Sequence, residues 1–118
     1  MRPGDVVLIR LPQFAGGPLK LRPALMLALL PGPYQNVFIC GISTQLEELQ
    51  ADWDELIAPQ DSDFVGSGLH RASAIRLSYL YSAHTREFAG VIGRIDSERL
   101  RRILARLVAA LSPTPLTA

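Results

Sequence analysis

The stretch from Arg22 to Ile42, RPALMLALLPGPYQNVFICGI, decides the fold of this chain. It contains an uninterrupted apolar run, Ala24 to Leu30, and ends with a second mostly apolar segment, Asn36 to Ile42. A Pro-Gly-Pro sequence at residues 31–33 breaks the chain between them. Each run has the length and composition of a buried strand, and the connection is short. The stretch therefore predicts an antiparallel β-hairpin.

Further segments on both sides of this hairpin extend the pattern of short strands. We expect additional strands at residues 5–11, 53–58, 72–77, 79–82 and 90–95. The end of the chain differs, because apolar residues recur there at helical spacing (Leu100, Ile103, Leu104, Leu107, Val108 and Leu111). This spacing predicts a helix over about 97–111, capped by Asp96 or Ser97, with a short Pro-containing tail at 112–118. Short strands closed by one helix describe a mainly β domain, a small curled sheet or barrel with a helix packed on it.

Length and composition limit the class of protein. The 118 residues form one domain, and 48% hydrophobic with 19% charged residues indicate a globular chain. No apolar run is long enough to cross a bilayer, and Asp5 stands where a signal peptide would begin its apolar region, so we expect a cytoplasmic protein without membrane contact. Cys40 is the single cysteine, and the sequence has no glycine-rich nucleotide motif. His70 and His84 do not stand at zinc-ligand spacing, and we therefore expect no metal and no cofactor.

The net charge of +1 hides an asymmetry. Residues 47–63 hold seven acids and no base, and the rest of the chain holds all twelve bases and four acids. Such a split indicates either a basic body that suits a polyanion, or a solvated acidic loop beside ordinary surface arginines. Arg99, Arg102 and Arg106 line one side of the expected helix, a pattern typical of a solvated face. Charge alone leaves both interpretations open.

An Arg-Pro pair, Arg22 and Pro23, stands at the entrance of the first apolar run. Proline tends to occupy the first position of a strand and holds the preceding residue extended. Arg22 is therefore expected at the rim of the sheet, with its stem over apolar surface. Its guanidinium then faces either solvent, as in any long surface side chain, or a ligand.

Five motifs in order resemble the MazF/PemK toxins, also called the Kid family, which are the toxic halves of type II toxin–antitoxin pairs. They are Gly4–Ile9 (GDVVLI), Arg22–Ala24 (RPA), Ile42–Gln45 (ISTQ), Gly68–Leu77 and Gly93–Asp96 (GRID). The resemblance implies an SH3-like barrel, a homodimer, and metal-independent cleavage of single-stranded RNA. The products would be a 2′,3′-cyclic phosphate and a 5′-hydroxyl. The implied partner is a cognate antitoxin whose acidic, disordered tail competes with RNA.

The resemblance also implies roles for individual residues. Arg22 takes the position of the catalytic arginine, and Ser43 takes that of a catalytic threonine, which keeps the hydroxyl. Arg76 falls on an RNA-contacting arginine, and Ser78 stands where the PemK branch has an aspartate. The other expected RNA contacts are Thr44, Gln45, His70, Arg71 and Ser78 itself.

The residue chemistry fits part of this assignment. A planar guanidinium such as Arg22 matches phosphate oxygens, and Ser43 or Thr44 can donate a hydrogen bond to a non-bridging oxygen. His70 and His84 are the only side chains that titrate near neutrality, and His70 is the better placed of the two. The identity of the general base stays open.

Two other functions remain compatible with the sequence. One is a gyrase-binding poison on the same fold, as in the CcdB toxins, although such a poison does not need Arg-Pro-Ala and Ser-Thr-Gln. The other is a catalytically weakened RNA-binding barrel, which the departures at Ser43 and Ser78 permit. Base recognition would depend on loops at 13–20 and 46–51, whose conformations the sequence does not predict.

Overall fold

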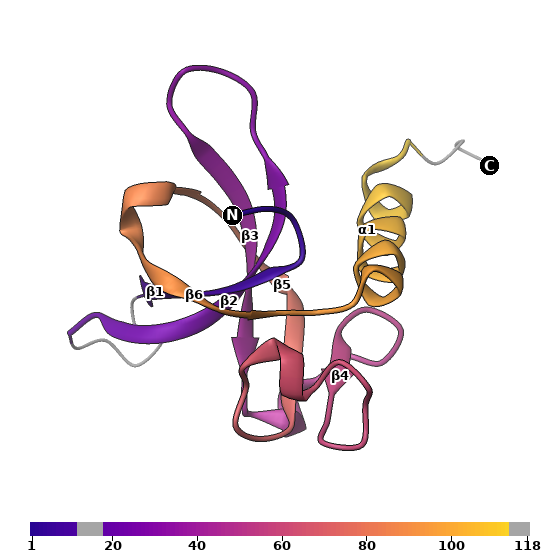
Figure 1. Cartoon of the computed structure of the whole chain (residues 1–118). Coiled ribbons are helices and arrows are strands. Elements are labelled where there is room, and N and C mark those ends of the chain that lie inside the picture. Colours follow the sequence, from indigo (N-terminus) through magenta and orange to yellow (C-terminus); the bar gives the residue numbers. More distant parts are fainter. Residues whose placement is uncertain (12–17, 114–118) are drawn as a thin grey trace.

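The computed structural model describes residues 1–11 and 18–113 (Figure 1). The strands of this part of the chain are β1 (Asp5–Leu11), β2 (Lys20–Leu29), β3 (Asn36–Ser43), β4 (Glu55–Ile57), β5 (Ser73–His84) and β6 (Phe88–Arg94). Short 3-10 helices η1 (Leu46–Glu48), η2 (Val65–Ser67) and η3 (Thr85–Glu87) connect strands, and the helix α1 spans Ser97–Leu111. Most of the expected loop at 13–20, and the last residues of the expected tail, lie outside the described residues.

The strands form one antiparallel sheet in the order β4-β5-β3-β2-β1-β6. The predicted hairpin is confirmed as β2 and β3, which lie at its centre with Leu25 opposite Cys40. The helix is confirmed at its predicted bounds, and Asp96 caps it by accepting a hydrogen bond from the Arg99 N–H at 2.7 Å. The predicted fold class, mainly β with a C-terminal helix, is therefore confirmed.

The sheet curls like a barrel, although its edge strands β4 and β6 do not pair with each other. The helix η2 packs against β6 instead. A Cβ atom on Gly93 would lie 2.3 Å from the Gly66 carbonyl oxygen, and one on Gly68 would lie 2.2 Å from the Ile92 carbonyl oxygen. Because backbone must approach backbone this closely, only glycine fits at Gly93 and Gly68. These two residues let η2 close the gap in the barrel.

Apolar side chains form a core on each face of the sheet. The larger core lies under α1 and includes Leu25, Leu27, Cys40, Ile75, Leu77, Ile103 and Leu107. The smaller core lies on the opposite face and consists of Val7, Ile9, Ala24, Met26, Val37, Ile39 and Ala83. The alternation of side chains along each strand sorts the residues between the two faces. Cys40 is fully buried, and this burial raises the pKa of its thiol.

The largest differences from the predicted strand bounds occur in β2 and β5. The second strand begins at Lys20, so Arg22 and Pro23 lie inside β2 and not at its entrance. The prediction failed there because β1 continues to pair along this segment, from Val6 opposite Leu25 to Leu11 opposite Lys20. The ladder with β3, in contrast, ends at Ala24. Proline has no N–H to donate, which accounts for the end of that ladder beside Pro23.

The segments 72–77 and 79–82 were expected as two strands and form the single strand β5. The ladder with β3 shifts between Gly41 opposite Arg76 and Cys40 opposite Leu80. Residues 77–79 therefore bulge out of the ladder. A bulge bends a strand without ending it, so the interruption in the sequence pattern did not mark a chain reversal.

Candidate functional site

The register of the sheet brings Arg22 and Ser43 to one end of two neighbouring strands. Ala24 lies opposite Gly41, and the next residues on the same face are Arg22 on β2 and Ser43 on β3. The β2–β3 ladder ends at the pair Ala24 and Gly41, so no ladder pairing joins the two strands at Arg22 and Ser43. This face is the one that carries the smaller core, opposite α1.

The Arg22 side chain has a buried apolar neighbour and, among the described residues, no ion-pair partner. The β1–β2 register places it opposite Ile9, a buried residue of the smaller core. Its side chain is half-buried. Within the described residues it forms no ion pair. A guanidinium in this position is oriented by apolar packing and remains available for an anion.

Ser43 ends β3, and the turn that follows orients its hydroxyl. The Ser43 Oγ accepts a hydrogen bond from the Gln45 N–H at 3.0 Å. This contact uses an acceptor lone pair and leaves the hydroxyl hydrogen available for donation. The next two residues, Thr44 and Gln45, are exposed. The hydroxyl therefore has the orientation and the donor that binding a phosphate oxygen would use.

Arg76 lies on the same face as Ser43, on the next strand. Ser43 is opposite Ala74 on β5, so Arg76 is its diagonal neighbour. The Arg76 side chain is buried between two carboxylates: its Nε lies 2.8 Å from Asp54 Oδ2, and its Nη1 lies 3.1 Å from Glu48 Oε2. The Nε contact is an ion pair outside hydrogen-bond geometry. The Tyr79 ring centroid is 4.9 Å from the guanidinium carbon, within range of a cation–π contact.

The other predicted RNA contacts occupy two places. His70 and Arg71 are exposed in the loop that leads into β5, near the end of the sheet where Ala74 pairs with Ser43. Ser78 is exposed in the β5 bulge. The structure thus gathers Arg22, Ser43, Thr44, Gln45, Arg76, His70 and Arg71 around one end of the sheet, whereas Ser78 lies in the bulge two residues after Arg76.

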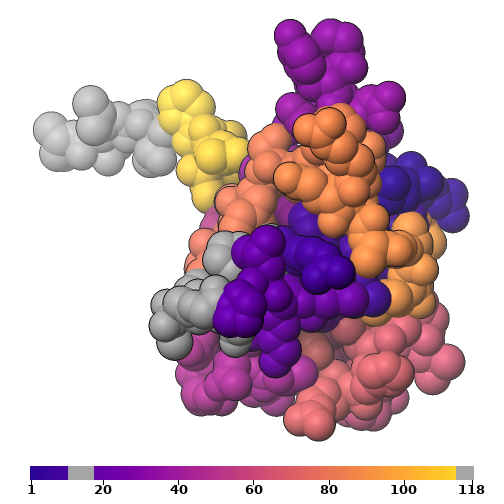
Figure 2. Space-filling model, turned by 90° about the vertical axis from the view of Figure 1, so that its left-hand side faces the viewer, coloured from indigo at the N-terminus to yellow at the C-terminus, as the bar shows by residue number. Residues whose placement is uncertain are grey.

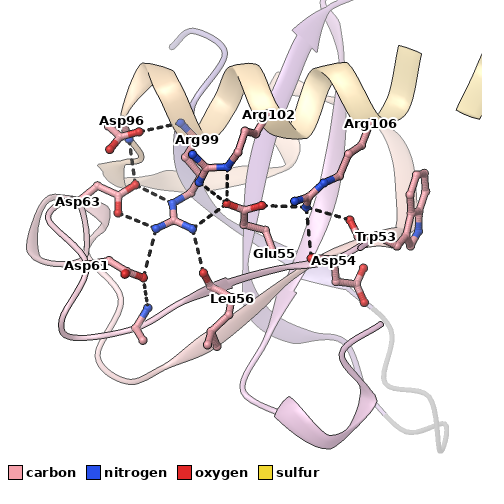
Figure 3. A network of polar contacts seen from close by, with 11 residues as sticks. Trp53, Asp54, Glu55, Leu56, Asp61, Asp63, Asp96, Arg99, Arg102 and Arg106 are labelled. Atoms are coloured by element: carbon pink, nitrogen blue, oxygen red, sulfur yellow. Dashed lines mark hydrogen bonds and ion pairs between the residues drawn. The ribbon is translucent and has the colours of Figure 1, made fainter. Parts of the chain in front are cut away.

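The acidic segment identified in the sequence pairs with α1, so the expected solvated arginine face is wrong for Arg99. That side chain is buried, and Asp63 Oδ2 and Asp61 Oδ2 lie 2.8 and 3.2 Å from its nitrogens (Figure 3). Glu55 contacts Arg99 and also binds Arg102 and Arg106. No local pattern in the sequence indicates this arrangement, because the partners lie 36 to 51 residues apart.

The pKa values within this cluster reflect the pairing. Burial opposes ionisation of Asp63, but hydrogen bonds from Arg99 and from the Asp96 N–H, with the Arg99 charge, lower the pKa of its carboxyl. Burial likewise opposes the charge of Arg99, yet its carboxylate partners raise its pKa. The hydrogen bond to Glu55 raises the pKa of Arg102. Asp63, Arg99 and Arg102 therefore remain ionised at neutral pH.

This pairing changes the distribution of basic charge on the surface. Arg99, Arg102 and Arg106 are paired with carboxylates, whereas Lys20 and Arg22, which share one face of β2, form no ion pair with any described residue. We call these two residues the hairpin basic surface. Figure 2 views the molecule from the side opposite α1, where the start of β2 (purple) lies between the η3–β6 segment (orange) and the segment after β3 (magenta). Positive charge without an ion-pair partner among the described residues thus lies at the start of β2, on the same face as Ser43.

No three His, Cys, Asp or Glu side chains in residues 1–11 and 18–113 are grouped so that they could hold a metal ion. None of the helices in these residues has the length and apolar character needed to span a membrane.

Comparisons with known proteins agree with the fold. A family model described as PemK-like, MazF-like toxin of type II toxin-antitoxin system matches residues 2–111. No curated protein sequence matches significantly. Among solved structures, the chain is similar to an endoribonuclease in complex with its cognate antitoxin from a mycobacterial species, with a TM-score of 0.61 and 15% identity. The match covers 98% of this chain and 99% of that one, and at this identity it shows a common fold.

Proposed function

Because the chain belongs to the PemK-like, MazF-like toxins of type II toxin–antitoxin systems, we propose that it is an endoribonuclease that cleaves single-stranded RNA without a metal ion. The observation that carries this proposal is the position of Arg22 and Ser43 on one face of the sheet, at the same end of β2 and β3. Arg22 offers a guanidinium without an ion pair among the described residues, and Ser43 offers an oriented hydroxyl. These are the groups that a reacting phosphate requires.

The proposed reaction is an internal transfer within the RNA. The ribose 2′-oxygen forms a bond to the adjacent phosphorus while the bond from phosphorus to the 5′-oxygen breaks. The 2′ proton passes to a base, and the leaving 5′-oxygen receives a proton. The products are a 2′,3′-cyclic phosphate and a 5′-hydroxyl, and no oxidant or cofactor takes part.

Each task in this reaction has a candidate side chain. The Arg22 guanidinium stabilises the negative charge that develops on the phosphorane oxygens, since its planar donors match that geometry. Ser43, aided by exposed Thr44, donates a hydrogen bond to a non-bridging oxygen. His70 is exposed near the same end of the sheet and is our candidate for proton exchange.

The hairpin basic surface also indicates which molecules bind this protein. We propose that RNA binds along the hairpin basic surface toward Arg76, and that a cognate antitoxin blocks this path with an acidic segment. The mycobacterial endoribonuclease of the same fold was solved with its cognate antitoxin, which supports an antitoxin partner here. We also propose a homodimer, and a cytoplasmic location where RNA is the target.

The test is cleavage of a long, unstructured RNA by the purified protein in the presence of EDTA. We expect discrete cuts that carry 5′-hydroxyl and 2′,3′-cyclic phosphate ends, detected by end-specific labelling before and after kinase treatment. Arg101→Ala is the matched control, since Arg101 is an exposed arginine on α1 without an ion pair among the described residues. The Arg101→Ala variant should cleave the RNA at the wild-type rate and at the same positions. RNA that stays intact at high protein concentration would contradict the proposal.

A further inference from the structure

The two carboxylates that hold Arg76 differ in their surroundings. The Asp54 side chain is fully buried, and it accepts hydrogen bonds from the Gln50 and Leu77 N–H groups, both at 2.9 Å. Asp54 is therefore a fixed internal partner that orients the arginine. The Glu48 side chain, in contrast, is 52% exposed and lies on the short helix η1. Its contact with Arg76 Nη1 is the outer one.

The outer contact lies beside the proposed reaction site. Arg76 is the diagonal cross-strand neighbour of Ser43, and such neighbours are about 7–8 Å apart. The helix η1 begins three residues after Ser43. An RNA strand with one phosphate at Arg22 and Ser43 would therefore bring another phosphate close to Arg76. In the free protein, the Glu48 carboxylate already accepts a hydrogen bond from Arg76 Nη1.

We propose that Glu48 acts as a built-in competitor of RNA: in the free protein its carboxylate takes the Arg76 N–H group that an RNA phosphate takes in the complex. This inference rests on the proposed function, because it assumes that RNA binds at Ser43. It assigns η1 a regulatory part, in which the acidic side chain lowers the affinity for RNA. Only RNA that also engages the hairpin basic surface gains enough to displace it.

The energetics allow this exchange. An ion pair with one exposed partner contributes about 0.2–1 kcal/mol. A phosphate that replaces the carboxylate forms a charge-assisted hydrogen bond of similar kind with the same donor. The buried Asp54 contact is untouched, so Arg76 keeps its orientation when Glu48 leaves. The effect of Glu48 on affinity is thus modest, and measurable.

The test compares Glu48→Gln with Glu47→Gln. Both residues are exposed on η1, and both substitutions remove one negative charge, but Glu48 alone contacts Arg76. Binding is measured by fluorescence anisotropy with an unstructured 2′-O-methyl oligoribonucleotide, which lacks the attacking hydroxyl and stays intact. We expect Glu48→Gln to bind about two- to fivefold more tightly than Glu47→Gln, the range that one exposed ion pair spans.

Salt dependence gives a second readout that needs no change at Arg76. When a phosphate displaces Glu48, the freed carboxylate takes up a cation, which offsets part of the counterion release from RNA. Glu48→Gln removes this offset, so its plot of log affinity against log salt should be steeper, by up to about 0.7. Glu47→Gln should keep the wild-type slope.

The outcomes separate this inference from the proposed function. If the wild type binds the oligonucleotide and the two variants bind equally, Glu48 is no competitor and the inference is wrong, whereas the proposed function stands. Weaker binding by Glu48→Gln would overturn it as well, since that result makes the Glu48 contact a support for RNA binding. If none of the three proteins binds RNA at any salt concentration, the proposed function fails first.

Discussion

Arg99 provides the most demanding test of how the fold is held together. The guanidinium of this buried residue on α1 binds both Asp63 oxygens, with nitrogen–oxygen distances of 2.8 and 3.1 Å. It also donates to Glu55 Oε1 at 3.1 Å and to the Leu56 carbonyl oxygen at 2.8 Å. Arg99→Ala would leave the Asp63 carboxylate without its arginine and the Leu56 carbonyl without this donor. The Asp63 carboxylate belongs to a side chain that is only 5% exposed, so it would not regain full hydration.

The expected loss follows from the burial of the pair. Only 8% of the Arg99 side chain and 5% of the Asp63 side chain are exposed, and removal of one partner from such a buried pair costs about 3–5 kcal/mol. Glu55 keeps Arg102 and Arg106, which places the loss toward the lower end of that range. For a domain of this length, the loss corresponds to a fall in Tm of about 10–20 °C.

Thermal unfolding followed by circular dichroism measures this fall. Arg101→Ala is the matched control, because it removes an exposed arginine from the same helix and should change the free energy of unfolding by no more than about 0.5 kcal/mol. The claim that this cluster holds α1 on the sheet would be refuted if the melting temperature of Arg99→Ala lay within about 2 °C of the Arg101→Ala value. A difference of 2 °C is roughly the effect of 0.5 kcal/mol.

Three further predictions concern the same structure. Gly93→Ala should destabilise the protein by at least about 1–3 kcal/mol in chemical denaturation, because its Cβ would meet backbone atoms at 2.3 Å, while Gly90→Ala, which meets nothing within 4 Å, should be neutral. Asp63→Asn should lower the Tm at pH 7, and the difference from the wild type should shrink as the pH falls below about 3.9. The folded-state pKa of Asp63 lies below its unfolded value of about 3.9, so its contribution is complete above that pH and is lost as the pH falls through the folded pKa. Log affinity for single-stranded RNA should fall with log salt at a slope of about −2 to −4, as expected for three to five phosphate contacts, and a flat response would contradict an electrostatic RNA surface.

The sequence was sufficient for elements whose signal is local. The hairpin of β2 and β3 follows from two apolar runs and a Pro-Gly-Pro break, and α1 follows from the helical spacing of its leucines and the capping Asp96. The position of Arg22 near Ser43 followed from family resemblance, and the register of the sheet agrees with it.

The sequence does not predict the features that depend on contacts between distant segments of the chain. A run of acids looks the same whether it is solvated or paired, and only the fold brings Glu55 under three arginines of α1. The resemblance predicts Arg76 as an RNA contact, but it does not predict that Asp54 and Glu48 hold this side chain in the free protein, from 22 and 28 residues away. The close approach at Gly93 likewise depends on η2, which no local pattern indicates.

The central claim is that Arg22 stabilises a reacting phosphate, and single-turnover RNA cleavage by Arg22→Ala tests it most directly. Because the substitution truncates a half-buried side chain without an ion pair among the described residues, the fold should persist, which a thermal melt verifies. Cleavage should slow by about a hundredfold or more, the effect of losing one preorganised donor, and Arg22→Lys should restore little, since an ammonium lacks the planar donors. Cleavage by folded Arg22→Ala at the wild-type rate would contradict the claim and leave Arg22 as an ordinary surface arginine.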